Sequence, residues 1–262
     1  MRVHVVSDVH GNAEALAKAG DGADALVVLG DLIDFVDYHD HSGGIMGSVF
    51  GPDKMATFAK LRRERQHSEL AAFAGTLWTS LADPGSVVED AIREQYERLF
   101  AAMTVPTYAT PGNVDAPALW PEYAGDNVRI LDGEVAELGG LRFGFVGGAL
   151  LPPGAVRRRG GVFHAYLRTD EEIAAALAGL DDVDVLCSHV PPDVPELTYD
   201  VVSRRAEFGS AALLEMIRTQ RPRWALFGHV HQPLASRMRV SYTECANVGH
   251  FQRTQRPYVL RW

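Results

Sequence analysis

Seven Asp, Asn and His residues of this chain have the donor types of a metal centre, and they fall in five separate segments. They are Asp8, His10, Asp31, Asn113, His189, His229 and His231. Oxygen and imidazole nitrogen donors of these kinds suit Mn, Fe and Zn. Two such ions held close together can activate water and clamp a phosphoryl group during an in-line displacement. The residue types therefore point to a two-metal centre that hydrolyses a phosphoester.

The positions of these residues along the chain strengthen this interpretation. Each of the five segments follows an apolar run typical of a β-strand, and ligands usually bind beyond the carboxyl ends of strands in α/β sheets. Glycine precedes Asp31, Asn113 and His229, where it permits close approach of the backbone at a tight strand tip. An isolated Asp-x-His pair, or a lone His189, is more often structural. The prediction therefore depends on the whole series of segments.

Strand-like and helical patterns alternate along the sequence, which is typical of the α/β class. Thr169 and Glu172 fit a capping box at the start of one helix. The expected strands are 2–7, 25–29, 105–110, several between 128 and 146, 183–188, 225–227 and 239–246. The expected helices outside the region 36–104 are 12–19, 169–180 and 208–219.

The stretch at about 36–104 has a different character and is expected to be a loop and helical insertion. Residues 38–51 are rich in His, Asp, Gly and Ser and predict a loop, whereas 53–81 and 86–103 predict helices. Ser86 and Glu89 fit a second capping box. Because this insertion falls between two core strands, we expect residues 1–262 to form a single domain. Its exposed helices offer a surface for a homodimer.

The composition limits the classes of partner. The 262 residues carry a formal net charge of -9, which argues against stable polynucleotide binding because that requires a basic surface. A small phosphoester remains compatible, since bound cations reverse the local field. No apolar run approaches the ~20 residues of a membrane span, and the N-terminus lacks a long apolar segment. We therefore expect a cytoplasmic protein with no membrane partner. Cys187 and Cys245 lie in apolar runs and are expected to be buried thiols.

The motifs, taken in order, resemble those of the calcineurin-like metallophosphoesterase superfamily. The similarity extends from the first strand nearly to the C-terminus, and it implies four layers, with two mixed β-sheets packed face to face and helices outside. The motifs are Asp8-Val-His10, Gly30-Asp31-Leu-Ile-Asp34, Gly112-Asn113-Val-Asp115, His189 and Gly228-His229-Val-His231.

The resemblance also implies roles for the individual residues. Asp31 would bridge the two ions, and Asn113 would take part in catalysis as well as in binding. Asp34 would orient a ligating histidine through a hydrogen bond. The remaining ligands would divide into one set for the first ion, Asp8, His10 and His231, and another for the second, Asn113, His189 and His229.

One position departs from the family pattern. The usual third motif is Gly-Asn-His-Asp/Glu, whose histidine protonates the leaving group or stabilises the transition state, and here that residue is Val114. A diester is therefore expected as the substrate in preference to a monoester. His39, His41 and His250 are candidate replacement proton donors, and structural or solvated histidines are the alternative. Two interpretations are open for Arg157, Arg158 and Arg159: they contact a phosphate of the substrate, or they belong to a solvated loop.

Two other functions compete with a binuclear phosphoesterase. A non-catalytic scaffold with the same fold would explain the loss at Val114, but degenerate scaffolds usually lose metal ligands and this chain retains all seven. A nuclease would require a basic, aromatic-rich stretch, which the sequence lacks.

Overall fold

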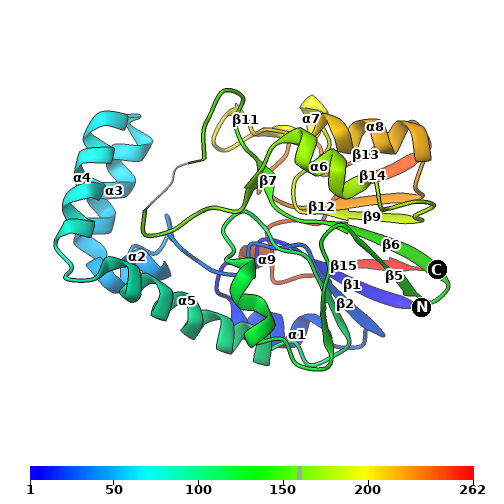
Figure 1. Cartoon of the computed structure of the whole chain (residues 1–262), viewed down its shortest axis with the longest axis horizontal. Coiled ribbons are helices and arrows are strands. Elements are labelled where there is room, and N and C mark those ends of the chain that lie inside the picture. Colours follow the sequence, from blue (N-terminus) through cyan, green and yellow to red (C-terminus); the bar gives the residue numbers. More distant parts are fainter. Residues whose placement is uncertain (158–160) are drawn as a thin grey trace.

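Two large mixed β-sheets face each other at the centre of the molecule (Figure 1). The computed structural model describes residues 1–157 and 161–262. The first sheet has the order β15 (Tyr258–Arg261), β1 (Arg2–Val6), β2 (Ala25–Val28), β3 (Thr107–Ala109) and β4 (Val128–Ile130). The second has the order β13 (Arg237–Val240), β14 (Thr243–Asn247), β12 (Trp224–Phe227), β9 (Val185–Ser188), β6 (Leu141–Val146) and β5 (Glu134–Leu138).

The alternation of side chains along the strands explains why the sheets pack in this way. Val3 and Val5 of β1 point into the core between the two sheets, where they meet Phe143 and Phe145 of β6. Val6 belongs to the core on the opposite face of the first sheet. Successive residues of a strand point to opposite faces, so a strand of continuous apolar residues is buried on both sides and requires a covering layer on each.

Helices supply both outer layers. The first sheet is covered by α1 (Ala13–Ala19), α5 (Pro84–Ala101) and the 3-10 helix η1 (Pro117–Glu122). The second is covered by α6 (Asp170–Leu177) and α8 (Ala211–Gln220), which carry Ile173 and Ile217 into the core. The expected capping box at the start of α6 is confirmed. The four-layer arrangement of two mixed sheets and flanking helices is thus as the sequence indicated.

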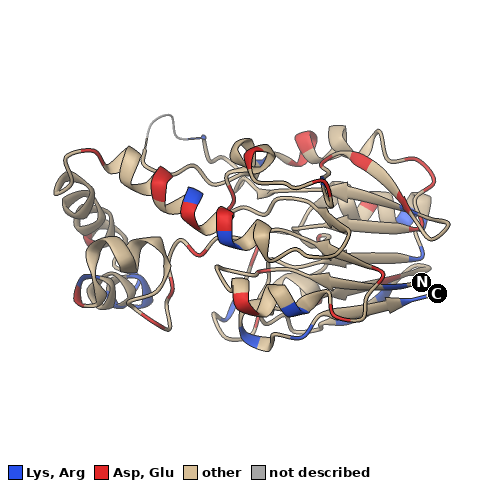
Figure 2. Cartoon of the chain, turned by 90° about the horizontal axis from the view of Figure 1, so that it is seen from below, with Lys and Arg blue, Asp and Glu red and all other residues tan. Residues whose placement is uncertain are grey.

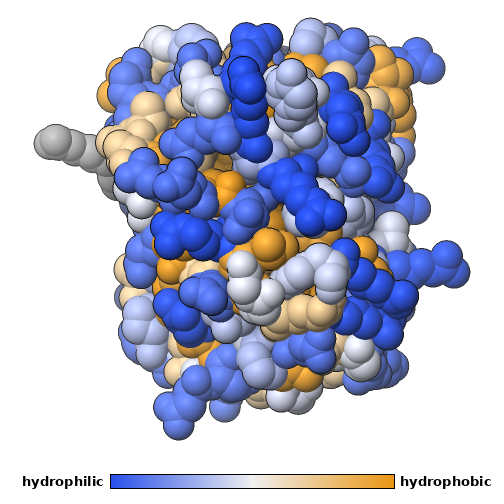
Figure 3. All heavy atoms as spheres, turned by 90° about the vertical axis from the view of Figure 1, so that its right-hand side faces the viewer, coloured by the Kyte–Doolittle hydropathy of each residue, from blue (hydrophilic) through white to orange (hydrophobic). Residues whose placement is uncertain are grey.

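The register of the strands determines where the chemistry lies. Val6 pairs with Val28 and Val28 with Ala109, so β1, β2 and β3 run parallel and end at the same level. In the second sheet Val146 of β6 pairs with Ser188 of β9, and these two strands are also parallel. The segments that follow these strands therefore meet at one edge of the sandwich. Figure 3 shows the opposite end, near the two termini, where hydrophilic residues predominate.

The insertion between β2 and β3 consists of α2 (Gly44–Phe50), α3 (Pro52–Arg63), α4 (His67–Thr79) and α5. The helix α2 replaces part of the predicted loop, because Ile45, Met46 and Phe50 are buried in spite of the glycines around them. The stretch 53–81, predicted to be helical, forms two helices, because the chain turns between α3 and α4. The α5 cap is Asp83, whose side chain accepts from Ser86 N, in place of the predicted Ser86–Glu89 box.

Short elements complete the chain. These are the strand pair β7 (Ala149–Leu150) and β8 (Leu167–Arg168), the hairpin β10 (Tyr199–Asp200) and β11 (Arg205–Ala206), and the helices α7 (Pro195–Thr198) and α9 (Phe251–Thr254). Cys187 and Cys245 are free and buried, as expected. Within residues 1–157 and 161–262, no helix is long and apolar enough to cross a membrane.

Candidate metal centre

Four of the seven candidate ligands have an unusual backbone conformation. Asp8, His10, Asp31 and His229 have φ values of 57°, 41°, 50° and 66°, and they are four of the ten non-glycine residues with positive φ in the described chain. Such conformations cost ~1–3 kcal/mol each and persist only where the surrounding structure enforces them. Their concentration at the strand tips indicates a site in which side-chain direction takes precedence over local stability.

Two glycines allow the loops at this edge to approach each other closely. A Cβ on Gly112 would lie 2.2 Å from Asp31 Oδ1, and a Cβ on Gly228 would lie 1.9 Å from Ser7 Oγ and 2.4 Å from Asp8 Oδ2. No side chain fits at these distances. The expectation that the glycines before Asn113 and His229 permit close backbone approach at the strand tips is consistent with this geometry.

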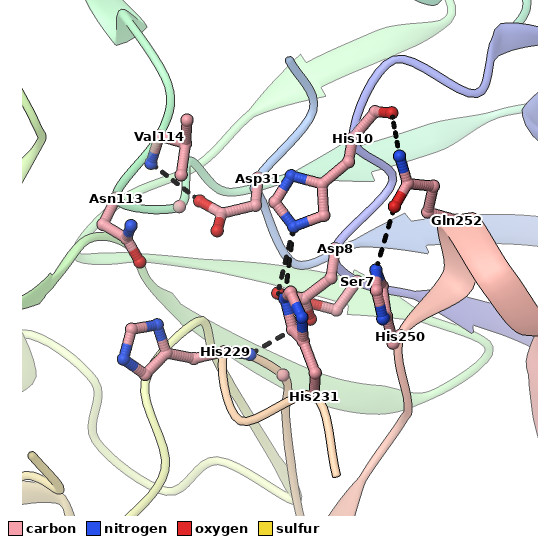
Figure 4. A network of polar contacts seen from close by, with 12 residues as sticks. Ser7, Asp8, His10, Asp31, Asn113, Val114, His229, His231, His250 and Gln252 are labelled. Carbon is pink, nitrogen blue, oxygen red and sulfur yellow. Dashed lines mark hydrogen bonds and ion pairs between the residues drawn. The ribbon is translucent and has the colours of Figure 1, made fainter. Parts of the chain in front are cut away.

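One group of donors lies around Asp8 (Figure 4). The Nε2 atoms of His10 and His231 are 3.2 Å apart, and Asp8 Oδ1 is 3.4 Å from His231 Nε2 and 4.0 Å from His10 Nε2. His250 stacks on His231 with ring centroids 3.8 Å apart and donates from Nε2 to Gln252 Oε1 at 3.2 Å. The structure thus brings His250 into the same cluster as two of the candidate ligands, His10 and His231.

A second group lies around Asp31. His189 Nε2 is 3.1 Å from Asn113 Oδ1 and 3.5 Å from Asp31 Oδ2. The ring of His229 faces that of His189, with centroids 5.2 Å apart. Donor atoms of Asp8, Asp31 and His189 all lie within 4.8 Å of one another, so the two groups adjoin. All seven residues singled out in the sequence therefore lie together in two neighbouring clusters.

Backbone carbonyls orient two of the histidines. His10 Nδ1 lies 3.3 Å from the Ile33 carbonyl oxygen, and His189 Nδ1 lies 2.7 Å from that of Leu29. A proton held on Nδ1 leaves Nε2 with its lone pair directed into the site. Asp34, expected in this orienting role, makes no side-chain hydrogen bond to a candidate ligand among the described residues. Instead, burial and the neighbouring Asp37 raise its pKa to about 7.

The donor geometry fits metal ions. Ligand bonds of ~2.1 Å place neighbouring donors about 3.0–3.4 Å apart in octahedral or tetrahedral arrangements. Four pairs of donor atoms in the site have similar separations, between 3.1 and 3.5 Å. They are His10 with His231, His231 with Asp8, His189 with Asn113, and His189 with Asp31. The backbone N–H of His229 donates to Asp8 Oδ2 at 3.0 Å. Asp8 Oδ1, also buried, has no hydrogen-bond partner in the described chain. A buried carboxylate oxygen left in this way is costly unless a cation accompanies it.

Electrostatics at the site also favour a cation. Burial opposes ionisation of Asp8, but the nearby imidazole of His231, together with His189 and His10, holds the pKa of Asp8 well below its usual range. Burial likewise disfavours a charged His189, yet Asp31 and Asp8 raise its pKa to about 9. Burial and His189 lower the pKa of His229 to about 4, so its imidazole is neutral and available as a ligand near pH 7.

The loop that carries Asn113 is fixed by Asp115 and Val114. Asp115 is fully buried and accepts from the backbone N–H groups of Gly112, at 2.8 Å, and Leu32, at 3.0 Å. Burial and the Asp31 charge raise its pKa to about 7. The Val114 N–H donates to Asp31 Oδ1 at 2.8 Å. Sequence patterns do not reveal these contacts, because each depends on a backbone amide.

The clusters open into a cavity of about 530 Å³. His39 and His250 line it, whereas His41 is not among its lining residues. Of the arginines considered as phosphate contacts, Arg157 pairs with Glu172 and does not line the cavity. Arg158 and Arg159 lie outside the described residues. Two other arginines, Arg62 and Arg205, do line the cavity, and no motif in the sequence singles them out.

Comparison with known proteins accords with this geometry. The sequence pattern of the calcineurin-like phosphoesterase family matches residues 1–233. The chain belongs to this family. The resemblance indicated by the motifs is thereby confirmed, and membership supports a hydrolase activity. No curated protein matches the chain.

Solved structures share the fold. One superimposes with a TM-score of 0.60 at 17% sequence identity and covers 96% of this chain and 91% of that chain. The crystal structure of TT1561 of Thermus thermophilus gives a TM-score of 0.54 at 16% identity and covers 99% of this chain and 98% of that chain. Identities this low establish the shared architecture, so the activity must be argued from the site.

Proposed function

We propose that this calcineurin-like phosphoesterase hydrolyses a small phosphodiester with two bound transition-metal ions, of Mn, Fe or Zn. The observation that carries the proposal is the meeting of seven donors in two adjoining clusters, where Asp8 Oδ1 is buried and has no hydrogen-bond partner among the described residues. Asp31 would bridge the ions. One ion would be held by Asp8, His10 and His231, and the other by Asn113, His189 and His229.

The chain's own groups prepare this centre. The Val114 N–H holds Asp31 Oδ1 in place. The carbonyls of Ile33 and Leu29 direct the imidazoles of His10 and His189 inward. When bound, the ions lower the pKa of water and stabilise charge on the phosphoryl oxygens. These positioning contacts reduce the reorganisation required during the reaction.

Two features favour a diester over a monoester. Val114 lacks a proton donor at the position where the family pattern has histidine, so good leaving groups are favoured. A diester also carries less negative charge into a protein of net charge -9. His39 and His250, whose side chains line the cavity, are the candidate proton donors in this proposal.

The alternatives receive less support. A non-catalytic scaffold has no use for four strained donor positions, each with a cost in stability. A polynucleotide substrate requires a continuous basic surface, whereas basic and acidic residues are interspersed over the face in Figure 2.

Metal analysis and kinetics test this proposal. Protein purified without chelator should contain close to two transition ions per chain, and Asp31→Ala should remove most of that metal and the activity. Asp21→Ala, at an exposed position, is the matched control and should retain both. An activated aryl diester should be hydrolysed faster than the corresponding monoester. Full metal occupancy in Asp31→Ala, or a monoester rate tenfold above the diester rate with the same metal, would overturn the assignment.

A further inference from the structure

The cavity beside the candidate metal centre has walls from three parts of the fold. The donors His10, Asp31, Asn113, His229 and His231 form its base. The insertion contributes Arg62, from the last turn of α3, and the hairpin β10–β11 contributes Arg205. A volume of about 530 Å³ is that of a site for a complete small molecule. The cavity is therefore larger than one phosphoryl group requires.

Arg62 forms no ion pair with an acidic residue in the described part of the chain. Its guanidinium lies over the ring of Tyr38, 4.3 Å from the centroid. None of the ion pairs within residues 1–157 and 161–262 includes it, although Arg93, Arg168 and Arg237 each pair with a carboxylate. Stacking on an aromatic ring holds a guanidinium in one orientation while leaving its N–H groups free to bind an anion.

Arg205 brings a second positive charge to the same cavity. It donates to Glu207 from Nε at 2.7 Å, with Nη2 at 2.6 Å from the same oxygen, Oε1. Although Arg62 remains accessible to solvent, partial burial and the positive charge of Arg205 lower its pKa from the ordinary value. The two arginines thus repel each other, and Glu207 pairs with Arg205 alone, an arrangement that an anion bound between the arginines would stabilise.

The other carboxylates at this wall already have partners. Asp37 Oδ1 accepts from the backbone N–H groups of His39 and Asp40. Asp200 accepts from those of Val202, Ser203 and Gln232. Asp37 and Asp200 are thus held by backbone amides, and neither forms an ion pair with Arg62 or Arg205 among the described residues.

We propose that Arg62 and Arg205 bind a second phosphate group of the substrate. This inference rests on the proposed function, and it narrows the substrate to a phosphodiester whose organic part carries a further phosphate. The stacked rings of Phe35 and Phe163, with centroids 4.5 Å apart, line the same cavity and present an apolar surface to that organic part. Arginine suits the role because its fork of donors matches the oxygens of a phosphate.

A matched pair of substrates tests the subsite by kinetics. Thymidine 5′-(4-nitrophenyl phosphate) and its 3′-phosphorylated form differ by one phosphate at a distance from the scissile bond. The metal-loaded enzyme should prefer the phosphorylated form by ~10-fold or more in kcat/KM, since hydrogen bonds to charged groups are worth ~1.5–3 kcal/mol. Arg62→Ala should abolish most of this preference and leave hydrolysis of the unphosphorylated form unchanged. Arg63→Ala, at the exposed neighbouring residue outside the cavity, is the control and should retain the preference.

Binding separates failure of the subsite from failure of the proposed reaction. Calorimetry should show thymidine 3′,5′-bisphosphate binding the metal-loaded protein ~10-fold more tightly than thymidine 5′-monophosphate, with the difference lost in Arg62→Ala. If neither aryl ester is hydrolysed but this difference is found, the proposed reaction is wrong and the subsite stands. Equal preference in the wild type and Arg62→Ala, in both assays, overturns the subsite.

Discussion

The substitution Gly112→Ala tests how tightly the loop after β3 packs against Asp31. The added Cβ would lie 2.2 Å from Asp31 Oδ1 and 2.3 Å from Asp31 N. The backbone of Asp31 cannot easily retreat, because its carbonyl accepts from His10 N at 2.9 Å. The carboxylate must therefore move, and its hydrogen bond from Val114 N–H, 2.8 Å long, must stretch or break.

The expected loss of stability follows from these contacts. Overpacking a tight interior costs ~1–3 kcal/mol, and a lost hydrogen bond to a charged group costs ~1.5–3 kcal/mol. The two costs overlap, since one displacement causes both, so we expect ~3 kcal/mol in total. For a chain of this size each kcal/mol lowers Tm by ~2–4 °C, which gives a fall of about 6–12 °C.

Thermal unfolding and elemental analysis of the same samples measure this effect. Gly112→Ala should unfold earlier and contain less metal, because Asp31 is the proposed bridge. Gly75→Ala is the matched control: it lies in α4 with nothing within 4 Å of the added Cβ, and it should stabilise the protein by ~0.5–1 kcal/mol. If Gly112→Ala has the Tm and metal content of the wild type, the close packing around Asp31 described above is incorrect.

Two further predictions concern Asp34 and the missing proton donor. The pKa of Asp34, raised by burial and by Asp37 to about 7, lies above its unfolded value, so the folded state loses stability as pH rises from about 4 through 7. Asp34→Asn should therefore increase the free energy of unfolding, measured by urea denaturation, by ~1–3 kcal/mol near pH 8 and leave it unchanged near pH 4. An equal increase at both pH values would contradict this. Val114→His should accelerate poor leaving groups, by up to ~10²-fold, if no other residue supplies the proton. If His39→Ala instead slows poor leaving groups selectively at unchanged metal content, His39 is the donor.

The sequence by itself determined the fold class, and it singled out the seven residues of the proposed donor set. Successive residues of a strand point to opposite faces, and β1 places Val3 and Val5 in one core and Val6 in the other, which requires layers on each side of the sheet. Asp and His residues directly after such strands are then placed at one edge, because parallel strands end together. The capping box at Thr169 was also predictable from the sequence, since it depends only on two residues three positions apart.

Local patterns failed in the insertion. Gly44 and Gly47 favour a loop by propensity, but Met46 and Phe50 pack against Met55 and Leu77, and this small core stabilises α2. Helix propensity differs by ~1 kcal/mol between glycine and alanine, which burial of two large apolar side chains exceeds. The break between α3 and α4 likewise depends on how the two helices pack.

Only the tertiary structure decided how the donors are held and what surrounds them. The orienting partners of His10 and His189 are carbonyls of Ile33 and Leu29, and every residue has a carbonyl, so no sequence pattern marks them. Arg62 lies more than 140 residues from Arg205 in the chain, and their meeting at one cavity depends on the position of the insertion. Residue type fixes which chemistry a side chain can perform, whereas long-range packing fixes which side chains meet.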